Sequence, residues 1–507
     1  MENIKKIQDL ENKLWKAANQ LRGNLSSEEY MHVVVAIVFL KQTSYLYEKA
    51  ILEMKKEYPS DWEKKSKDVD YLNHFGCSFI VPKEASWNYI SDYATKEEIG
   101  IIIDDAFRAL ENNNKMLLGL FDKNFSRDAI DKVKLGKVVS IFSNINISDQ
   151  EEDLLGRVYE YFLGKFFLDR GQSAGAFYTP KSIVSLMVNI VDPRKGKIYD
   201  PCCGSGGMFI QAKQHLEDLN LGINDFKVYG QEYNEITWKL GKINLLLQGF
   251  KYTDIDLGKQ SADTLANDLH KNVEFDYILV NPPFNQKDWS ESARENRSWK
   301  YGTPPITSAN YAWLQHVIEK MAQKGKAAVV LARGSLTSQQ LKEEKNIREN
   351  LIKDNIITAI IDLPDKLFYT TQIPACIWIF DKAKTTNDIL FIDASSFGKL
   401  IPGERAKKEI LNEDIEFLTK IYMDFIEKQE KIDIPEIAKS IGINEIIKND
   451  YSLLPGTYIT IKEEILTKDK IKNELVQNIK DFLNLVDESN ELESKVKEAI
   501  KKINMDI

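Results

Sequence analysis

The tetrapeptide Asn281-Pro282-Pro283-Phe284 combines an amide, two rigid prolines and an aromatic ring. It follows Phe275–Val280 (FDYILV), an apolar run that predicts a strand. Two successive prolines end that strand and stiffen the turn, so we expect Asn281 to project from the carboxyl edge of a sheet. The Asn281 side-chain oxygen and the Pro282 carbonyl could accept both N–H groups of a planar amino group. Acceptors fixed in this way make the amino nitrogen more nucleophilic as it becomes tetrahedral.

The aromatic ring that ends this motif suits the same chemistry. Phe284 offers a face on which a flat base can stack, a contact worth about 1–3 kcal/mol in proteins that bind single strands. No general base is needed, because the amino nitrogen loses its proton only after it has begun to form the bond to the transferred group. The same four residues also occur in ordinary turns, and their position after a buried strand favours the catalytic interpretation.

A glycine-rich run, Asp200–Gly207 (DPCCGSGG), lies between a predicted strand and a predicted helix. Its glycines let the backbone turn tightly and approach a ligand, and the following helix offers free N–H groups at its N-terminus. A plain connection between strand and helix would have the same composition. The lysine of a P-loop is missing, which argues against a nucleotide phosphate. Asp200, an acid at the end of the strand, suits a ligand that carries an amino group.

A second acid, Glu232, ends the next predicted strand. Acids at this position bind ribose hydroxyls in dinucleotide-binding folds. Alone, such a residue is as often a solvated acid at a strand end, but the glycine-rich run before it favours ribose binding. The predicted ligand is therefore a nucleoside with no phosphate requirement, and S-adenosylmethionine fits that description.

Alternating strands and helices must position these residues. We expect strands at 197–200, 227–232, 275–280, 327–331, 356–362, 375–380 and 389–392. We expect helices near 207–219, 236–247, 311–321 and 341–352. The alternation predicts a doubly wound, mostly parallel sheet of the Rossmann-like α/β class, in which ligands bind at the carboxyl ends of the strands.

Both ends of the chain are expected to be helical. Ser26 and Glu29 fit a capping box that opens a helix, and the apolar run Val33–Leu40 suits a buried part of it. Beyond about residue 400 the chain is rich in charge, and Ile461–Ile503 carries apolar residues at helical spacing. This tail could pack on its own domain or dock on another subunit.

The length of 507 residues predicts two or three domains, and the net charge is −9. An acidic chain has little general attraction for phosphate, so basic residues must be concentrated on one face or a partner must help to hold nucleic acid. No apolar run is long enough for a membrane span and the N-terminus resembles no signal peptide, so we expect a cytoplasmic protein. The four cysteines show no zinc-site spacing, and we expect free thiols and no metal.

A basic and aromatic segment follows Phe284. Its members are Trp289, Arg294, Arg297, Trp299 and Lys300. The segment is either a flexible loop close to DNA or an ordinary charged surface loop, and the sequence does not separate the two. His316, on the next predicted helix, is expected to be structural.

The motifs occur in an order that resembles the N6-adenine DNA methyltransferases. They are Gly175–Pro180 (GAFYTP), then Asp200–Gly207, then Asn281–Phe284. Over nearly the full length, the chain resembles the modification subunits of type I restriction–modification systems. This likeness includes a helical N-terminal region and a helical tail after Asp450–Tyr458 (DYSLLPGTY).

The resemblance implies a division of the chain and roles for its residues. It implies an N-terminal helical domain at 1–155, a methyltransferase domain at 156–425 and a helical tail for partner docking at 426–507. It implies that S-adenosylmethionine binds at Tyr178, Thr179, Pro180, Asp200, Gly204, Ser205, Gly206, Glu232 and Asp263. The first three would border its methionine end, and Asp263 would bind its adenine amino group. Asp254 and Asp256 are alternatives for that last role.

The resemblance also implies partners. The target adenine of double-stranded DNA must be flipped out of the helix to reach Asn281. A separate specificity subunit would read the DNA sequence, with two modification subunits to each specificity subunit, and a restriction subunit could join them.

Two other functions share some of these features. Protein-glutamine methyltransferases use a similar Asn-Pro-Pro-aromatic motif on a planar amide. A non-catalytic assembly subunit could keep the fold alone, although intact Asp200, Gly204, Glu232 and Asn281 argue against that interpretation.

Overall fold

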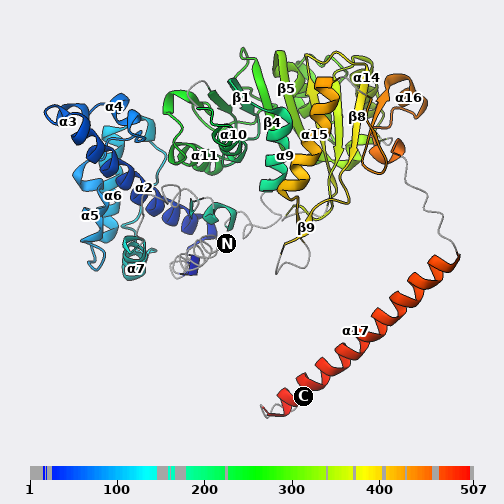
Figure 1. The fold of residues 1–507 in the computed structure, drawn as a ribbon. Helices are drawn as coiled ribbons and strands as arrows, with labels where there is room; N and C mark the ends of the chain where they lie inside the picture. The colour runs from blue at the N-terminus through cyan, green and yellow to red at the C-terminus, as the bar shows by residue number, and fades with distance from the viewer. Residues whose placement is uncertain are drawn as a thin grey trace. The chain divides into compact units, whose positions relative to one another are not determined.

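Figure 1 shows the fold of the chain as a computed structural model. The structure describes residues 15–16, 19, 25–144, 158–159, 161–165, 179–222, 226–338, 341–368, 373–401, 407–428, 431–459 and 468–502. The chain divides into two compact units, Met1–Ile459 and Thr460–Ile507.

The N-terminal part is helical and begins with the long helix α2 (Ser27–Glu57). The Ser26 hydroxyl accepts from the Glu29 amide at 3.2 Å and the Glu29 carboxylate accepts from the Ser26 amide at 2.9 Å, so the capping box is confirmed. Val33–Leu40 is fully buried, as its apolar run predicts. The other helices of this part are α3 (Trp62–Lys65), α4 (Val69–His74), η1 (Lys83–Ala85), α5 (Trp87–Ser91), α6 (Ile99–Asn113), η2 (Lys115–Leu117) and α7 (Lys132–Ser143).

The second part of this unit is built on a ten-stranded sheet with the order β11-β12-β8-β6-β7-β5-β4-β1-β2-β3. The strands are β1 (Gly196–Asp200), β2 (Phe226–Gly230), β3 (Ile255–Asp256), β4 (Phe275–Val280), β5 (Met321–Ala332), β6 (Ile357–Asp362), β7 (Ala375–Asp381), β8 (Asp388–Asp393), β11 (Asp433–Ile434) and β12 (Ala438–Gly442). Strands β3, β2, β1, β4 and β5 are parallel neighbours, and β7 runs antiparallel between β5 and β6. The predicted mostly parallel sheet is confirmed.

Helices cover both faces of this sheet (Figure 1). Successive strand residues point to opposite faces, so Ile198 packs in one hydrophobic cluster and Tyr199 in another. The first cluster includes α9 (Lys181–Val191), α10 (Gly207–Asp218), α11 (Glu235–Leu247) and α15 (Asn412–Lys428). The second includes α13 (Asn310–Lys320), α14 (Lys342–Lys353) and α16 (Ile443–Lys448). Further short elements are η5 (Tyr252–Asp254), α12 (Glu291–Asn296), η6 (Arg333–Leu336), η7 (Pro455–Thr457) and the hairpin of β9 (Lys399–Leu400) and β10 (Lys408–Glu409).

The order in which strands are added to the sheet reverses between β1 and β4. From β1 the chain passes through α10 to β2 on one side, and from β4 it passes through α13 to β5 on the other. The two strands are parallel neighbours, with Ile198 opposite Tyr277 and Tyr199 opposite Ile278. Ligands of doubly wound sheets bind at such a switch point, outside the carboxyl ends of the strands.

The segment 426–507, expected to be a helical tail, is not helical throughout. Strand β12 pairs antiparallel with β8, so the sheet continues as far as Gly442. Its sequence, AKSIG, has too few apolar residues to indicate a strand, and pairing with the edge of β8 decides its structure.

The second unit contains the helix α17 (Lys468–Lys502). Large apolar side chains on it are 38–65% exposed, namely Leu475, Val476, Ile479, Phe482, Leu483, Leu485, Val486 and Leu492. In the part of the chain that the structure describes, no helix has the length and apolar character needed to cross a membrane.

Candidate active site

A cavity of about 590 Å³ lies where β1, β2 and β4 end. Its wall includes eight of the residues predicted from the sequence, which are Thr179, Asp200, Gly204, Ser205, Glu232, Asp263, Asn281 and Pro283. The structure therefore brings Thr179 of the first motif, the glycine-rich run, the turn at Asn281 and the more distant Asp263 together around one space.

Other predicted residues support the cavity or lie elsewhere. Pro180 precedes α9 and Gly206 precedes α10, each as the residue that caps the helix. Phe284 is buried, and the centroid of its ring lies 5.4 Å from that of Phe368, edge to face. Pro282 is also buried. Tyr178 falls outside the described residues.

The glycine-rich loop has a backbone that only glycine adopts readily. Gly204 and Gly206 have φ angles of +53° and +84°. Helix α11 supports the loop through a hydrogen bond, in which Asn244 Nδ2 donates to the Ser205 carbonyl at 2.8 Å. Gly241 of the same helix allows close approach, since a Cβ there would lie 2.7 Å from the Gly204 carbonyl oxygen. These contacts from α11 were not foreseen, because a glycine inside a helical pattern gives no sign of its neighbour.

Two carboxyl groups face the loop from the ends of β1 and β2. Asp200 accepts from the Cys202 amide at 2.9 Å. Burial, with a smaller contribution from nearby Glu232, raises the pKa of Asp200 to about 8. Glu232 accepts from the Gly204 amide at 3.0 Å and from the Asn234 amide at 2.8 Å. Burial also raises the pKa of Glu232, although these amides oppose the shift. Such poorly solvated acids suit a ligand with ammonium and hydroxyl groups.

The three candidate acids near residue 260 differ in their position relative to the cavity. Asp263 contributes to the cavity wall, whereas Asp254 and Asp256 do not. Asp263 Oδ1 accepts from the amides of Leu265 and Ala266 at 3.0 and 3.3 Å, which fixes the side chain at the start of a turn. Of the three, Asp263 is therefore the acid placed to meet a ligand in this cavity.

Asn281 follows β4 directly and has an oriented amide. Its Nδ2 donates to Thr179 Oγ1 at 2.8 Å, which leaves Oδ1 as the acceptor on the other side. Oδ1 is buried and has no hydrogen-bond partner among the described residues. A buried acceptor without a donor costs free energy, on the order of 1–3 kcal/mol, so this atom is prepared to accept from a ligand.

The cavity wall also contains residues that sequence reasoning missed. They are chiefly Gln286, Asp288, Ser290 and Trp313, together with Trp289, which the sequence analysis placed only in the basic and aromatic segment. Trp289 Nε1 donates to the Pro305 carbonyl at 2.9 Å, and its ring lies edge to face against Trp299 at 5.7 Å. The two tryptophans in a polar segment were the available signal that it folds against the site.

The basic side chains of this segment bond to the protein itself. Arg294 donates to the Pro304 carbonyl at 2.9 Å, Arg297 pairs with Glu319, and Lys300 pairs with Asp354 at 2.8 Å. Of the two interpretations of this segment, these contacts favour an ordinary surface segment packed on the protein over a flexible loop close to DNA. His316, expected to be structural, is fully buried and lines no part of the cavity.

Comparisons with known proteins fit this arrangement. The family model N-6 DNA Methylase matches residues 150–466, and the HsdM N-terminal domain model matches residues 10–142. The type I restriction enzyme HindI methylase subunit of Haemophilus influenzae is 36% identical over 72% of this chain and 83% of its own length. The MjaIX methylase subunit of Methanocaldococcus jannaschii is 32% identical over 97% of this chain and 91% of its own.

A solved structure has the same fold. It is a type I restriction–modification system methyltransferase subunit from Streptococcus thermophilus, 24% identical, with a TM-score of 0.75. The match covers 89% of this chain and 99% of that one.

Proposed function

Because the chain belongs to the N-6 DNA methylase family, among the methylase subunits of type I restriction enzymes, we propose a role for each part of its cavity in that family's reaction. The reaction is the transfer of a methyl group to the N6 amino group of adenine in DNA. The chain performs it as the modification subunit of a type I restriction–modification system.

The methyl donor proposed here is S-adenosylmethionine. The cavity wall supplies the carboxyl groups of Asp200, Glu232 and Asp263, and its volume of about 590 Å³ suits a nucleoside ligand. Asp200 would hold the ammonium group of the methionine end, Glu232 the ribose and Asp263 the adenine amino group. When bound, this cofactor supplies an electrophilic methyl group on a sulfonium.

One observation carries the catalytic proposal: the buried Oδ1 of Asn281 has no hydrogen-bond partner in the part of the chain that the structure describes. Thr179 fixes the amide so that Oδ1 accepts from one N–H of the target amino group, and the Pro282 carbonyl accepts from the other. Electron density then gathers on the nitrogen, and its proton leaves after the new bond has begun to form. Stacking of the flipped base on Phe284 stays a prediction, since that ring packs against Phe368.

Replacing Asn281 tests this proposal. Asn281→Ala should lower the rate of methyl transfer by about 10²–10³ or more, as for other preorganised polar groups. Cofactor affinity should stay within about twofold, because the amide acts on the target. The measurement is incorporation of labelled methyl into DNA by the co-expressed subunits, beside a cofactor titration.

A matched control is Asn113→Ala, since Asn113 donates only within α6, to the Ala109 carbonyl at 2.9 Å. Its rate should be unchanged. An equal loss of cofactor affinity in Asn281→Ala would make Asn281 structural. Label appearing in protein but not in DNA would overturn the assigned substrate.

The partners of the chain are also proposals. They are double-stranded DNA with a flipped adenine, one specificity subunit for every two copies of this chain, and a restriction subunit where one is present. The net charge of −9 supports a partner that supplies many of the contacts to the phosphate groups of DNA. The exposed apolar side chains of α17 support a docking role for the tail.

The division into domains is also a proposal. Separate family matches at 10–142 and 150–466 support a boundary near residue 155 between the helical N-terminal domain and the catalytic domain. The pairing of β12 with β8 supports a catalytic domain that continues to about Ile459, with the docking tail after it.

A further inference from the structure

The loop of residues 262–270, here called the Asp263 loop, crosses the ends of β1 and β2. At its start, the Ala262 amide donates to the Glu232 carbonyl at 2.9 Å. Next to Asp263, Thr264 Oγ1 donates to the Pro201 carbonyl at 2.6 Å. These bonds attach the start of the loop to the ends of β1 and β2. The Asp263 carbonyl in turn accepts from the Asn267 amide at 2.7 Å, so the position of Asp263 also depends on the later residues of the loop.

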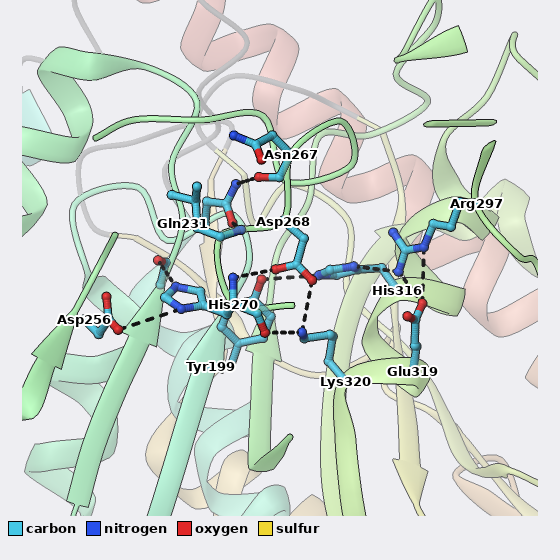
Figure 2. Close-up of polar contacts among 12 residues, drawn as sticks. Tyr199, Gln231, Asp256, Asn267, Asp268, His270, Arg297, His316, Glu319 and Lys320 are labelled. Atoms are coloured by element: carbon cyan, nitrogen blue, oxygen red, sulfur yellow. Dashed lines mark hydrogen bonds and ion pairs between the residues drawn. The ribbon is translucent and has the colours of Figure 1, made fainter. Parts of the chain in front are cut away.

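The Gln231 side chain makes three hydrogen bonds to this loop. Its Nε2 donates to the Asn267 carbonyl at 2.7 Å and to the Ala262 carbonyl at 3.3 Å. Its Oε1 accepts from the Leu269 amide at 3.0 Å. Figure 2 shows the amide directed at Asn267, and the residue is fully buried. The side chain thus ties both ends of the Asp263 loop to the end of β2.

The backbone of Gln231 joins the other two parts of the site. Its amide donates to the Asp200 carbonyl at 3.1 Å, and its carbonyl accepts from the Cys203 amide at 3.0 Å. It also precedes Glu232 in the chain. One residue therefore contacts the end of β1, the glycine-rich loop and the Asp263 loop, without lining the cavity itself.

A buried ion pair holds the far end of the loop. Lys320, at the end of α13 and 3% exposed, pairs with Asp268 at 3.0 Å and donates to the His270 carbonyl (Figure 2). His270 Nε2 lies 3.0 Å from the Gly230 carbonyl. Because this end is held independently, loss of the Gln231 bonds should leave the loop attached but release Asn267. Asp263 should shift with it, since the Asn267 amide donates to the Asp263 carbonyl.

We propose that Gln231 is a positioning residue that sets the distance between the ribose-binding Glu232 and the adenine-binding Asp263. The proposal rests on the roles proposed above for those two acids. Its consequence is specific, since a released loop should cost recognition of the adenine amino group more than recognition of the remaining ligand.

The test compares two ligands on the full-length chain by calorimetry. They are S-adenosylhomocysteine and S-inosylhomocysteine, which carries an oxygen in place of the adenine amino group. The natural chain should prefer the first by about ten- to hundredfold, because the second leaves Asp263 facing an acceptor. Gln231→Met keeps the size of the side chain but loses all three bonds, and it should reduce that preference to about threefold or less.

Two further variants separate positioning from folding. Gln231→Leu is uncharged and also loses all three bonds, so it should also lose the preference, and it decides the matter if Gln231→Met does not fold. Gln315→Met is the matched control, since buried Gln315 likewise bridges loop backbone, accepting from the Tyr301 amide at 3.0 Å and donating to the Gly302 carbonyl at 2.8 Å. It should lower the melting temperature and keep the preference.

Two results would overturn the inference in distinguishable ways. If the natural chain does not prefer the adenine ligand, the role of Asp263 in the proposed function fails. If the natural chain prefers it and the folded Gln231 variants keep that preference, Gln231 is structural and the proposed function stands.

Discussion

Asp200 holds a carboxyl group where its charge is poorly solvated. The pKa of about 8, raised by burial from an ordinary value of 3.8, means that the folded chain favours the protonated form. The contribution of this group to stability is therefore complete below about pH 4 and is lost as pH rises through about 8. Asp200 therefore contributes least to stability at the pH where its charge would best serve the ammonium-binding role proposed for it.

Asp200→Asn should remove this dependence on pH. The variant should gain stability relative to the natural chain as pH rises from 5 to 8, by at most about 1.4 kcal/mol per pH unit. Thermal unfolding at pH 5, 6.5 and 8 measures the difference, and a calorimetric titration should show cofactor affinity reduced tenfold or more.

The natural chain serves as the reference for the variant. All other titratable groups are the same in the two proteins, so their effects of pH on stability cancel in the difference. A stability difference that stays constant across this range would mean that Asp200 is ionised throughout. Unchanged cofactor affinity would remove it from the methionine end of the ligand.

At the scale of elements, the periodic features of the sequence predicted the structure well. The strand at Phe275–Val280 has the expected bounds, and the turns after β1 and β4 lie at the cavity as the motifs indicate. The features of the site that the sequence did not predict depend on contacts between residues far apart in the chain. The loop support from α11 and the wall at Gln286–Ser290 depend on which surfaces meet in three dimensions, and local spacing carries no record of that.

Gly241→Ala tests the support from α11. Alanine favours a helix over glycine by about 1 kcal/mol, yet here its Cβ would press on the Gly204 carbonyl at 2.7 Å. We expect cofactor affinity to fall about tenfold or more, since the loop must move to relieve the clash.

Gly164→Ala is the control, because its Cβ would meet no described atom within 4 Å. It should leave cofactor affinity unchanged. Equal affinities in both variants would show that the loop tolerates displacement.

At the scale of the whole molecule, the chain combines the cavity at the sheet with a helix, α17, that has exposed apolar side chains. The two belong to different compact units. A chain that ends at Ile459 should therefore bind cofactor normally but fail to assemble with the specificity subunit and to methylate a defined DNA sequence. Cofactor titration and co-purification with the partner measure the two halves of this prediction.

Point changes within α17 refine it. Ile479→Asp with Phe482→Asp places charge among the exposed apolar side chains and should prevent assembly, while Asn478→Asp with Lys480→Asp should not. Selective methylation of one DNA sequence by the isolated full-length chain would contradict the partner hypothesis, and a recognition element would then lie in this chain.

In the role proposed for Asn281, its side-chain oxygen, which has no partner among the described residues, would also select bases by hydrogen-bond polarity. Adenine and cytosine present an exocyclic amino donor, whereas guanine and thymine present a carbonyl oxygen at the equivalent position of the base edge. An oxygen facing a fixed acceptor finds no bond and is repelled, and sites built around a missing donor reject such analogues by large factors. An oxo base flipped into this site by mistake would thus be refused before any chemistry, without a separate proofreading step.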